Sequence, residues 1–157
     1  MITWLIVGAV AMSLFGSIYW LKPSPRDTRL AKLRFEAIRA GLQIRQFTFK
    51  PDSAKNGVRD EVPGTTYTLL RPGKQQGGDL KFRIVGQKGW DVDGLPEGYC
   101  WHDQGTVADA ERFRQALAAV NDHILLLEVY DNRVTLMAAE GKEASADGYK
   151  SFLSAFL

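Results

Sequence analysis

Charge is absent from the first 21 residues of the chain, Met1 to Leu21. A helix of this length is about 30 Å long, which matches the hydrocarbon core of a bilayer. No Lys or Arg precedes the run, and its one A-x-A triplet, Ala9-Val10-Ala11, comes too early to follow a complete apolar region. A cleaved signal peptide is the competing interpretation, and these absences favour a retained membrane anchor.

Cysteine is nearly absent, since Cys100 is the only one, and this agrees with a reducing compartment. The run Cys100-Trp101-His102-Asp103 does place a thiol, an imidazole and a carboxylate within four positions, and His123 is the one further imidazole that could join them. A closed zinc site usually repeats its Cys/His pairs, and no second pair follows. We expect a small buried thiol beside surface polar groups, and neither a metal site nor a Cys–His nucleophile.

Signatures of catalysis and nucleotide binding are missing as well. The sequence has no GxxxxGK[ST], GxGxxG, HExxH or GxSxG motif. Asp91, Asp93 and Gly94 begin like a calcium loop, but the rest of that loop does not follow, so we expect a hairpin turn there. These absences predict a protein that is not an enzyme and that has no cofactor and no metal.

Aromatic residues are present at both ends of the uncharged run, where amphipathic rings favour the membrane interface. Trp4 lies near one end, and Tyr19 and Trp20 lie at the other. Small residues recur at every fourth position between them, at Ala9, Ser13 and Ser17. This spacing lets two helix backbones approach closely, so association with a second copy or another helix is one interpretation. The other is that small residues are common in such helices.

Cationic residues gather directly after the run. Residues 22–50 hold eight Lys or Arg and two acids, a local net charge of +6, whereas the chain from Pro51 onward has a net charge of −4. Lys22, Arg26 and Arg29 are close enough to contact the lipid surface. Because cations near a span tend to stay cytoplasmic, we expect a bacterial inner-membrane protein with its amino terminus outside and its carboxy-terminal domain in the cytoplasm.

Residues 26–41 follow a helical pattern, with Ser24 or Asp27 as the cap and Gly41 as its end. Its apolar stripe comprises Leu30, Leu33, Ala37 and Ala40, and Phe35, Ile38 and Leu42 broaden it. A basic amphipathic helix serves lipid binding, partner docking or nucleic acid binding. Because so broad a stripe needs a core to cover it, we expect a core helix with a lipid-facing edge. We expect no nucleic acid, since no such fold signature accompanies the charge.

The remaining chain is long enough for one core. Strand-like runs occupy residues 43–49, 65–71, 80–85, 124–130 and 133–139, with shorter pieces at 90–92 and 99–101. Residues 50–63 read as a mobile loop and residues 72–78 as a hairpin loop. Helices are expected after Thr106, paired with Asp109, and after Asp147. We predict an α+β fold with three parts: a transmembrane helix over 1–21, a basic juxtamembrane helix over 22–42, and a domain over 43–157. In this domain we expect a mostly antiparallel sheet with helices packed on one face.

Three aromatic residues, Trp90, Tyr99 and Trp101, gather before the helix at Thr106. Exposed together they would form a partner-binding surface. In a domain of this size, the other interpretation places them in the core or at its rim.

The sequence Leu21-Lys22-Pro23-Ser24-Pro25-Arg26, between an uncharged span and a basic stretch, resembles the YajC-type accessory subunit of the bacterial protein translocase. The run from Pro23 to Leu42 also resembles that of small single-span proteobacterial inner-membrane proteins. No residue role is carried over. The anchor and the missing motifs predict a cytoplasmic domain that binds a membrane-protein partner or a second copy, as an accessory or scaffold module. The alternative is a membrane-tethered enzyme or small-ligand-binding domain that uses residues 90–103.

Overall fold

The computed structural model describes residues 1–73 and 77–157. The chain divides into two compact units, Met1–Lys32 and Leu33–Leu157. The first unit contains α1 (Ile2–Trp20), and no residue of this helix is buried. Among the described residues, α1 is the one helix that is long and apolar enough to cross a membrane by length and composition, with a mean hydropathy of 1.8.

The second helix, α2 (Pro25–Arg39), begins where Ser24 caps it. The Asp27 backbone N–H donates to Ser24 Oγ at 3.1 Å, and Ser24 Oγ donates to the Asp27 carboxylate at 2.7 Å. The hydrogen bonds that the hydroxyl and the backbone N–H of Ser24 donate to the carboxylate lower the pKa of Asp27. Gly41 ends the helix with a φ of 93°, which a residue with a Cβ rarely adopts. Of the two predicted caps, the structure therefore uses Ser24.

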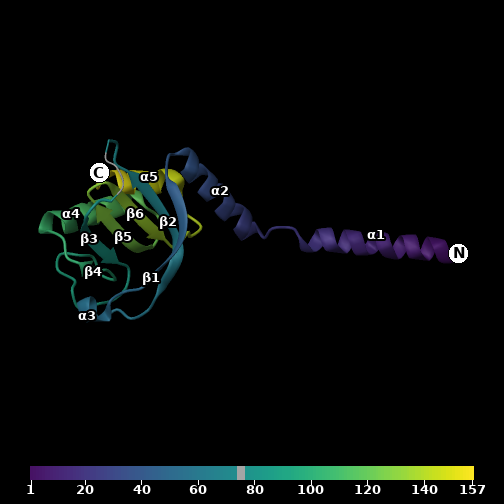
Figure 1. Cartoon of the computed structure of the whole chain (residues 1–157), viewed down its shortest axis with the longest axis horizontal. Coiled ribbons are helices and arrows are strands. Elements are labelled where there is room, and N and C mark those ends of the chain that lie inside the picture. The colour runs from purple at the N-terminus through teal and green to yellow at the C-terminus, as the bar shows by residue number, and fades with distance from the viewer. Residues whose placement is uncertain (74–76) are drawn as a thin grey trace. The chain divides into compact units, whose positions relative to one another are not determined.

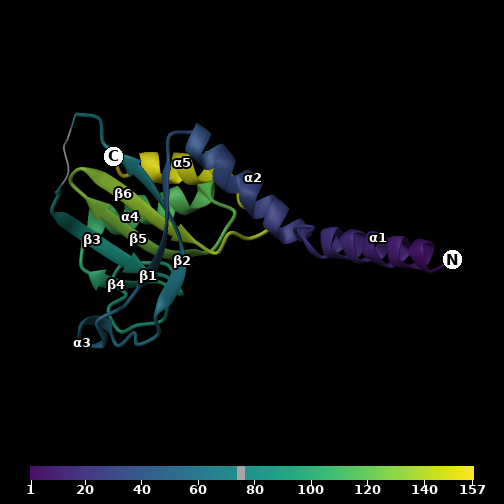
Figure 2. The same cartoon turned by 45° about the vertical axis from the view of Figure 1, so that its right-hand side comes forward.

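The second unit is built on a six-stranded antiparallel sheet in the order β1-β2-β6-β5-β3-β4 (Figure 1). Its strands are β1 (Gln43–Phe49), β2 (Val62–Leu70), β3 (Leu80–Val85), β4 (Cys100–Asp103), β5 (Ile124–Tyr130) and β6 (Arg133–Ala138). Figure 2 shows β1 and β2 running side by side at one edge. The prediction of an α+β fold with an antiparallel sheet is confirmed.

The strands β5 and β6 form a hairpin through Asp131-Asn132, as the sequence predicts, and this hairpin occupies the middle of the sheet. The hairpin expected between residues 65–71 and 80–85 is wrong, because β6 and β5 lie between β2 and β3. Residues 74–76 of its expected loop lie outside the described residues. The expected strand piece at 90–92 also does not form.

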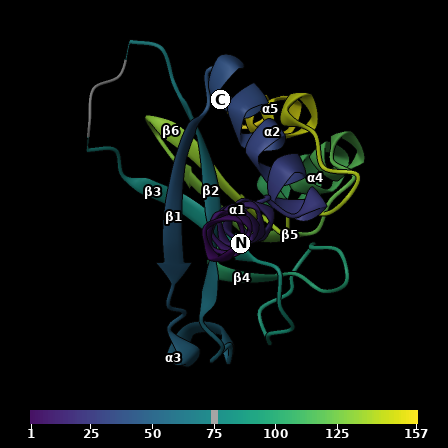
Figure 3. The same ribbon diagram turned by 90° about the vertical axis from the view of Figure 1, so that its right-hand side faces the viewer.

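Two helices of the C-terminal part, α4 (Val107–Ala116) and α5 (Ala146–Ser154), lie on one side of the strands (Figure 3). A 3-10 turn, η1 (Leu117–Ala119), follows α4. Thr106 and Asp109 form the predicted capping box of α4. The cap of α5 is Ser145, whose Oγ accepts from the Gly148 N–H at 3.1 Å, so the prediction of Asp147 is wrong by two positions.

The core lies between the sheet and these helices, and the second half of α2 contributes to it. Its largest fully buried side chains include Trp101, Tyr67, Tyr149, Phe113 and Phe152. From α2, Leu33 and Ala37 are buried there, whereas Phe35 and Ile38 are 61% and 59% exposed. Phe35 lies about 200° around the helix from Leu33, on the side away from the core. The prediction that Phe35 and Ile38 broaden the buried stripe is therefore wrong.

A polar cluster within the second unit ties α2 to the sheet. Arg34 donates to both carboxylate oxygens of Glu140, at 2.9 and 2.7 Å, and to Thr65 Oγ1 at 3.0 Å. The Tyr67 hydroxyl also donates to Glu140. Burial alone would raise the pKa of Glu140, but the hydrogen bonds from Arg34 and Tyr67 outweigh it and lower the pKa overall. Glu140 has a φ of 55°, so this cluster also holds a backbone conformation that non-glycine residues seldom adopt.

The segment expected to be a mobile loop, residues 50–63, instead packs against the sheet and includes α3 (Ser53–Asn56). Asn56 is buried, its Oδ1 accepts from the Val58 N–H at 3.0 Å, and its backbone oxygen accepts from the Trp90 N–H at 3.1 Å. A second apolar cluster forms on this side of the sheet from Phe49, Val58, Val62, Val85, Cys100, Leu126 and Met137. The segment thus covers one end of the face that lies opposite the helices.

Candidate functional site: a groove across the open face of the sheet

The uncovered part of the sheet is polar because its strands alternate. Tyr67 and Leu69 of β2 point into the helix-covered core, so Thr66 and Thr68 point to the other side. On β6, Thr135 alternates in the same way with buried Val134. The same strands therefore present apolar side chains to one face and hydroxyl groups to the other.

A groove of about 1420 Å³ crosses this polar face. We call it the sheet groove, and its lining residues are Gln43, Arg45, Gln46, Phe47, Thr48, Phe49, Lys50, Thr66, Thr68, Leu70, Arg83, Glu128, Tyr130, Asn132, Arg133 and Thr135. They come from five of the six strands and from the two connecting residues Lys50 and Asn132.

Hydroxyl groups form the floor of the sheet groove. The Oγ1 atoms of Thr68 and Thr135 lie 2.9 Å apart, in hydrogen-bond contact across β2 and β6. Thr66 Oγ1 donates to the backbone oxygen of Arg45 at 3.1 Å. A hydroxyl that makes one hydrogen bond retains further donor or acceptor capacity. The floor can therefore bind a polar ligand without breaking its own contacts.

The charge of the sheet groove is positive, with four cationic side chains and one carboxylate in the lining. Arg83 is engaged within the protein, since Nε donates to Glu128 at 2.7 Å and Nη1 donates to Asp103 at 2.9 Å. Arg133 lies over the ring of Tyr130, with its guanidinium carbon 4.0 Å from the ring centroid. Arg83 thus neutralises Glu128, and Lys50 contacts Glu61 at 3.4 Å. Arg45 and Arg133 supply the remaining positive charge of the sheet groove.

Apolar side chains stand beside these cations. Phe47 of β1 and Leu70 of β2 are each 47% exposed. Hydroxyl groups, cations and exposed apolar side chains in one groove suit a ligand that combines anionic and apolar groups. The arrangement is chemically one for binding.

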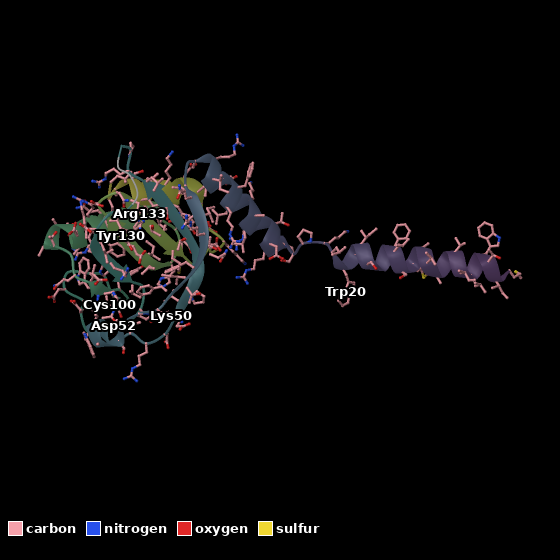
Figure 4. All side chains as sticks on the ribbon, in the orientation of Figure 1. Trp20, Lys50, Asp52, Cys100, Tyr130 and Arg133 are labelled. Carbon is pink, nitrogen blue, oxygen red and sulfur yellow. The ribbon has the colours of Figure 1, made fainter. Side chains whose placement is uncertain are left out.

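The predicted polar run at Cys100 to Asp103 lies on the edge strand β4 and contacts the sheet groove through Arg83 and Phe49. Figure 4 shows Cys100 and Asp52 apart from Tyr130 and Arg133. His102 Nε2 accepts from the Asp52 N–H at 3.0 Å, so the proton is assigned to Nδ1, which donates to Asp103 at 2.8 Å. Both ring nitrogens are therefore used within the protein.

Asp103 connects this imidazole to a chain of ion pairs. Its carboxylate contacts Lys55 at 2.5 Å as well as Arg83. Burial by itself would raise the pKa of Asp103, but the hydrogen bonds from Lys55 and His102 and the charge of Arg83 lower it overall. This chain of ion pairs runs from Lys55 through Asp103 and Arg83 to Glu128, and it links four elements of the domain, α3, β4, β3 and β5.

Cys100 is fully buried, and burial, followed by the nearby charge of Asp91, raises the pKa of its thiol. The prediction of a small buried thiol is confirmed, but the polar groups beside it are not all at the surface as expected, since His102 is buried. His123 lies instead beside Tyr99, with 6.0 Å between the ring centroids. Within residues 1–73 and 77–157, no group of three or more His, Cys, Asp or Glu side chains is placed to hold a metal ion.

The three aromatic residues singled out as a partner surface do not share one. Trp101 is 2% exposed and Tyr99 is 9% exposed, and both belong to the core. Trp90 alone is on the surface, at 68% exposed. Alternation along β4 turns Trp101 toward the helices, so the core interpretation holds for Tyr99 and Trp101 and the shared-surface interpretation is wrong.

The predicted interfacial aromatics of α1, Trp4, Tyr19 and Trp20, are all exposed. Lys22 Nζ lies 4.7 Å from the centroid of the Tyr19 ring. Arg26 and Arg29 follow on the first turns of α2. The small residues Ala9, Ser13 and Ser17 share one side of α1, where Ser17 Oγ donates to the backbone oxygen of Ser13 at 2.9 Å.

The chain matches no protein-family model, no curated protein and no solved structure. The resemblance to a translocase accessory subunit therefore stays a prediction.

Sequence reasoning missed the sheet groove. A local signal was present in the alternation of Thr66 and Thr68 with Tyr67 and Leu69, which marks a strand with one polar face. The convergence of Arg45 and Arg133 had no such signal, because it depends on β6 pairing with β2.

Proposed function

We propose that this chain is a single-span inner-membrane protein that presents a binding domain to the cytoplasm, as an accessory or scaffold subunit of a membrane-protein partner. The sheet groove is the observation on which the proposal depends. In this proposal, the sheet groove binds an extended acidic segment of the partner.

The anchor is supported by the character of α1. An apolar helix in which no residue is buried exposes a long apolar surface, and a bilayer would cover that surface. The cations that follow α1 in the sequence support the cytoplasmic orientation by the positive-inside rule. A fluorescent protein that matures only in the cytoplasm, fused to Leu157, tests this orientation. Fluorescence supports it, and activity of a periplasm-specific reporter at the same position contradicts it.

The nature of the occupant follows from the lining. Arg45 and Arg133 favour carboxylates, the threonine hydroxyls favour peptide groups, and Phe47 and Leu70 favour apolar side chains. A polypeptide offers all three. A nucleic acid is disfavoured because no nucleic-acid-binding signature accompanies the cations of this chain.

Site-specific photo-crosslinking in the intact cell tests this function. A benzophenone amino acid replaces Phe47 at the sheet groove, and a matched variant carries it at Val107, which is 88% exposed on α4. We expect one discrete adduct from position 47, with an acidic segment in its crosslinked peptide. We expect no such adduct from position 107.

Charge reversal distinguishes binding from chance proximity. Arg45→Glu combined with Arg133→Glu should abolish the adduct at position 47, because the segment would then face like charges. An adduct that survives the double reversal, or one with RNA, contradicts the proposal.

The proposal does not extend to an enzyme or ligand site in residues 90–103. Tyr99, Cys100 and Trp101 are buried there and belong to the two apolar clusters of the domain.

A further inference from the structure

The helix α2 has an apolar pair on the side that faces away from the core. Leu33 and Ala37 are at most 4% exposed, whereas Phe35 and Ile38 are each more than half exposed. The latter two lie three positions apart and so are neighbours on the helix surface. Together with Arg39 they form what we call the outer face of α2. A helix that already buries one stripe in its own core has no folding need for a second apolar one.

The charge of the outer face is positive. The Arg39 guanidinium carbon lies 5.8 Å from the centroid of the Phe35 ring, so the cation stands beside the apolar pair. Apolar and aromatic side chains next to Arg or Lys are typical of helices that lie at the surface of an anionic membrane. The local net charge of +6 over residues 22–50 complements the same surface.

Covalent connection limits how far the outer face can move from the end of α1. Four residues separate Trp20, the end of α1, from Pro25, and the five fully extended steps between them span at most about 18 Å. From Pro25 to Phe35 the helix rises about 15 Å. Phe35 therefore stays within about 33 Å of the end of α1 at every angle between the two helices, which gives it a high effective concentration near any membrane that holds α1.

We propose that the outer face of α2 lies on the anionic lipid surface, with Phe35 and Ile38 at the boundary between headgroups and acyl chains and Arg39 at the lipid phosphates. This inference rests on the membrane anchor of the proposed function. It adds a second attachment, which fixes the domain at the bilayer instead of leaving it on a free tether.

Spin labels on the full-length chain in reconstituted bilayers test the inference. Single cysteines are introduced by Ile38→Cys on the outer face, by Glu36→Cys as an exposed control on the same helix, and by Leu14→Cys in α1. The native Cys100 is fully buried and does not compete for label. The bilayers are phosphatidylcholine alone or a mixture with phosphatidylglycerol, and accessibility to oxygen and to a water-soluble nickel chelate is measured.

We expect the label at position 38 to lose nickel accessibility several-fold and to gain oxygen accessibility in the anionic bilayer only. The label at position 36 should stay accessible to nickel in both. Adding Arg39→Gln should lower the lipid-bound population at position 38 about fivefold, the effect of about 1 kcal/mol for one cation near an anionic surface.

The two proposals fail in different ways. A label at position 14 that stays accessible to nickel contradicts the membrane anchor itself. The label at position 14 can instead be inserted while the label at position 38 is equally accessible to nickel in both bilayers. That result overturns only the lipid contact of α2. Protection of position 38 from both reagents indicates a protein cover, such as a second copy, and also overturns it.

Discussion

The two faces of one sheet differ in what covers them. Tyr67 and Thr66 are neighbours on β2, and they point to opposite faces of the sheet. Tyr67 is buried beneath the helices, whereas Thr66, which is 5% exposed, lies in the floor of the sheet groove. The helix-covered face contributes most of the hydrophobic stabilisation, because the large aromatic side chains are there. The open face contributes less, and its cations and hydroxyl groups are thereby available for binding. The division predicts that stability and binding respond to different substitutions.

The largest effect is expected on the covered face. Phe152→Ala should lower the free energy of unfolding by about 3–5 kcal/mol, because it leaves a cavity among Phe113 and Phe156. Denaturant unfolding of the full-length chain in mild detergent, followed by tryptophan fluorescence, measures this loss. On the open face, Thr68→Val removes only the contact to Thr135 and should cost about 1 kcal/mol. Equal losses would contradict the division between the two faces.

A smaller effect is expected where α2 is tied to the sheet. Glu140→Gln should cost about 1.5–3 kcal/mol, since it removes charged hydrogen bonds from Arg34 and Tyr67. Glu143→Gln, at an exposed position in the same loop, is the matched control and should change stability by less than about 0.5 kcal/mol. The same unfolding measurement applies, and a variant as stable as the control would show that the cluster is dispensable.

Acid should weaken this cluster and also the separate chain of ion pairs through Asp103. The pKa of Glu140 and the pKa of Asp103 are both lowered in the folded protein, so their contribution to stability is complete above the ordinary carboxyl pKa. It is lost as pH falls below that value toward the folded-state pKa. Denaturation midpoints between pH 7 and pH 3 (about the range of carboxyl titration) should therefore decline, and Glu140→Gln should decline less steeply. Parallel curves for the two proteins would rule out a contribution from Glu140.

The smallest effect on stability is expected at the rim of the open face. Arg133→Ala should change the free energy of unfolding by less than about 0.5 kcal/mol, because Arg133 lies outside the core and makes only peripheral contacts, a stack on Tyr130 and a long hydrogen bond of 3.4 Å to Asn132. The same substitution should weaken the crosslink from position 47 if the sheet groove holds an acidic segment. If the Arg133→Ala variant is as stable as the wild type and crosslinks as well, Arg133 has no role in binding.

Local sequence signals predicted the elements that depend on neighbours in the chain. The capping box at Thr106 and Asp109 and the hairpin at Asp131-Asn132 are examples. The strand order was not predictable in this way, because the pairing of β2 with β6 joins distant segments. The sequence pattern placed Phe35 and Ile38 in the buried stripe of α2. A count of apolar residues does not separate that stripe from a second, exposed one on the same helix.

The candidate site was largely outside what the sequence could predict. The buried thiol of Cys100 was expected from its scarcity and surroundings. The sheet groove was not, since Arg45, Thr68 and Arg133 come together only through the sheet. The sequence offered Trp101 as part of a partner-binding surface because it is an aromatic residue near a turn. The alternation of side chains along β4 places it in the core instead.

The strands in the middle of the sheet, β5 and β6, follow the other four strands in the sequence and are synthesised after them. Until residues 124–138 have been synthesised, β2 and β3 each have one edge without its native partner, and the nascent chain exposes both. Loss of the final hairpin would separate the strands into two unconnected pairs, β1–β2 and β3–β4, in place of a smaller sheet. A chain terminated before Ala138 should therefore remain misfolded and be bound by chaperones or degraded by proteases. It should not yield a partly functional domain.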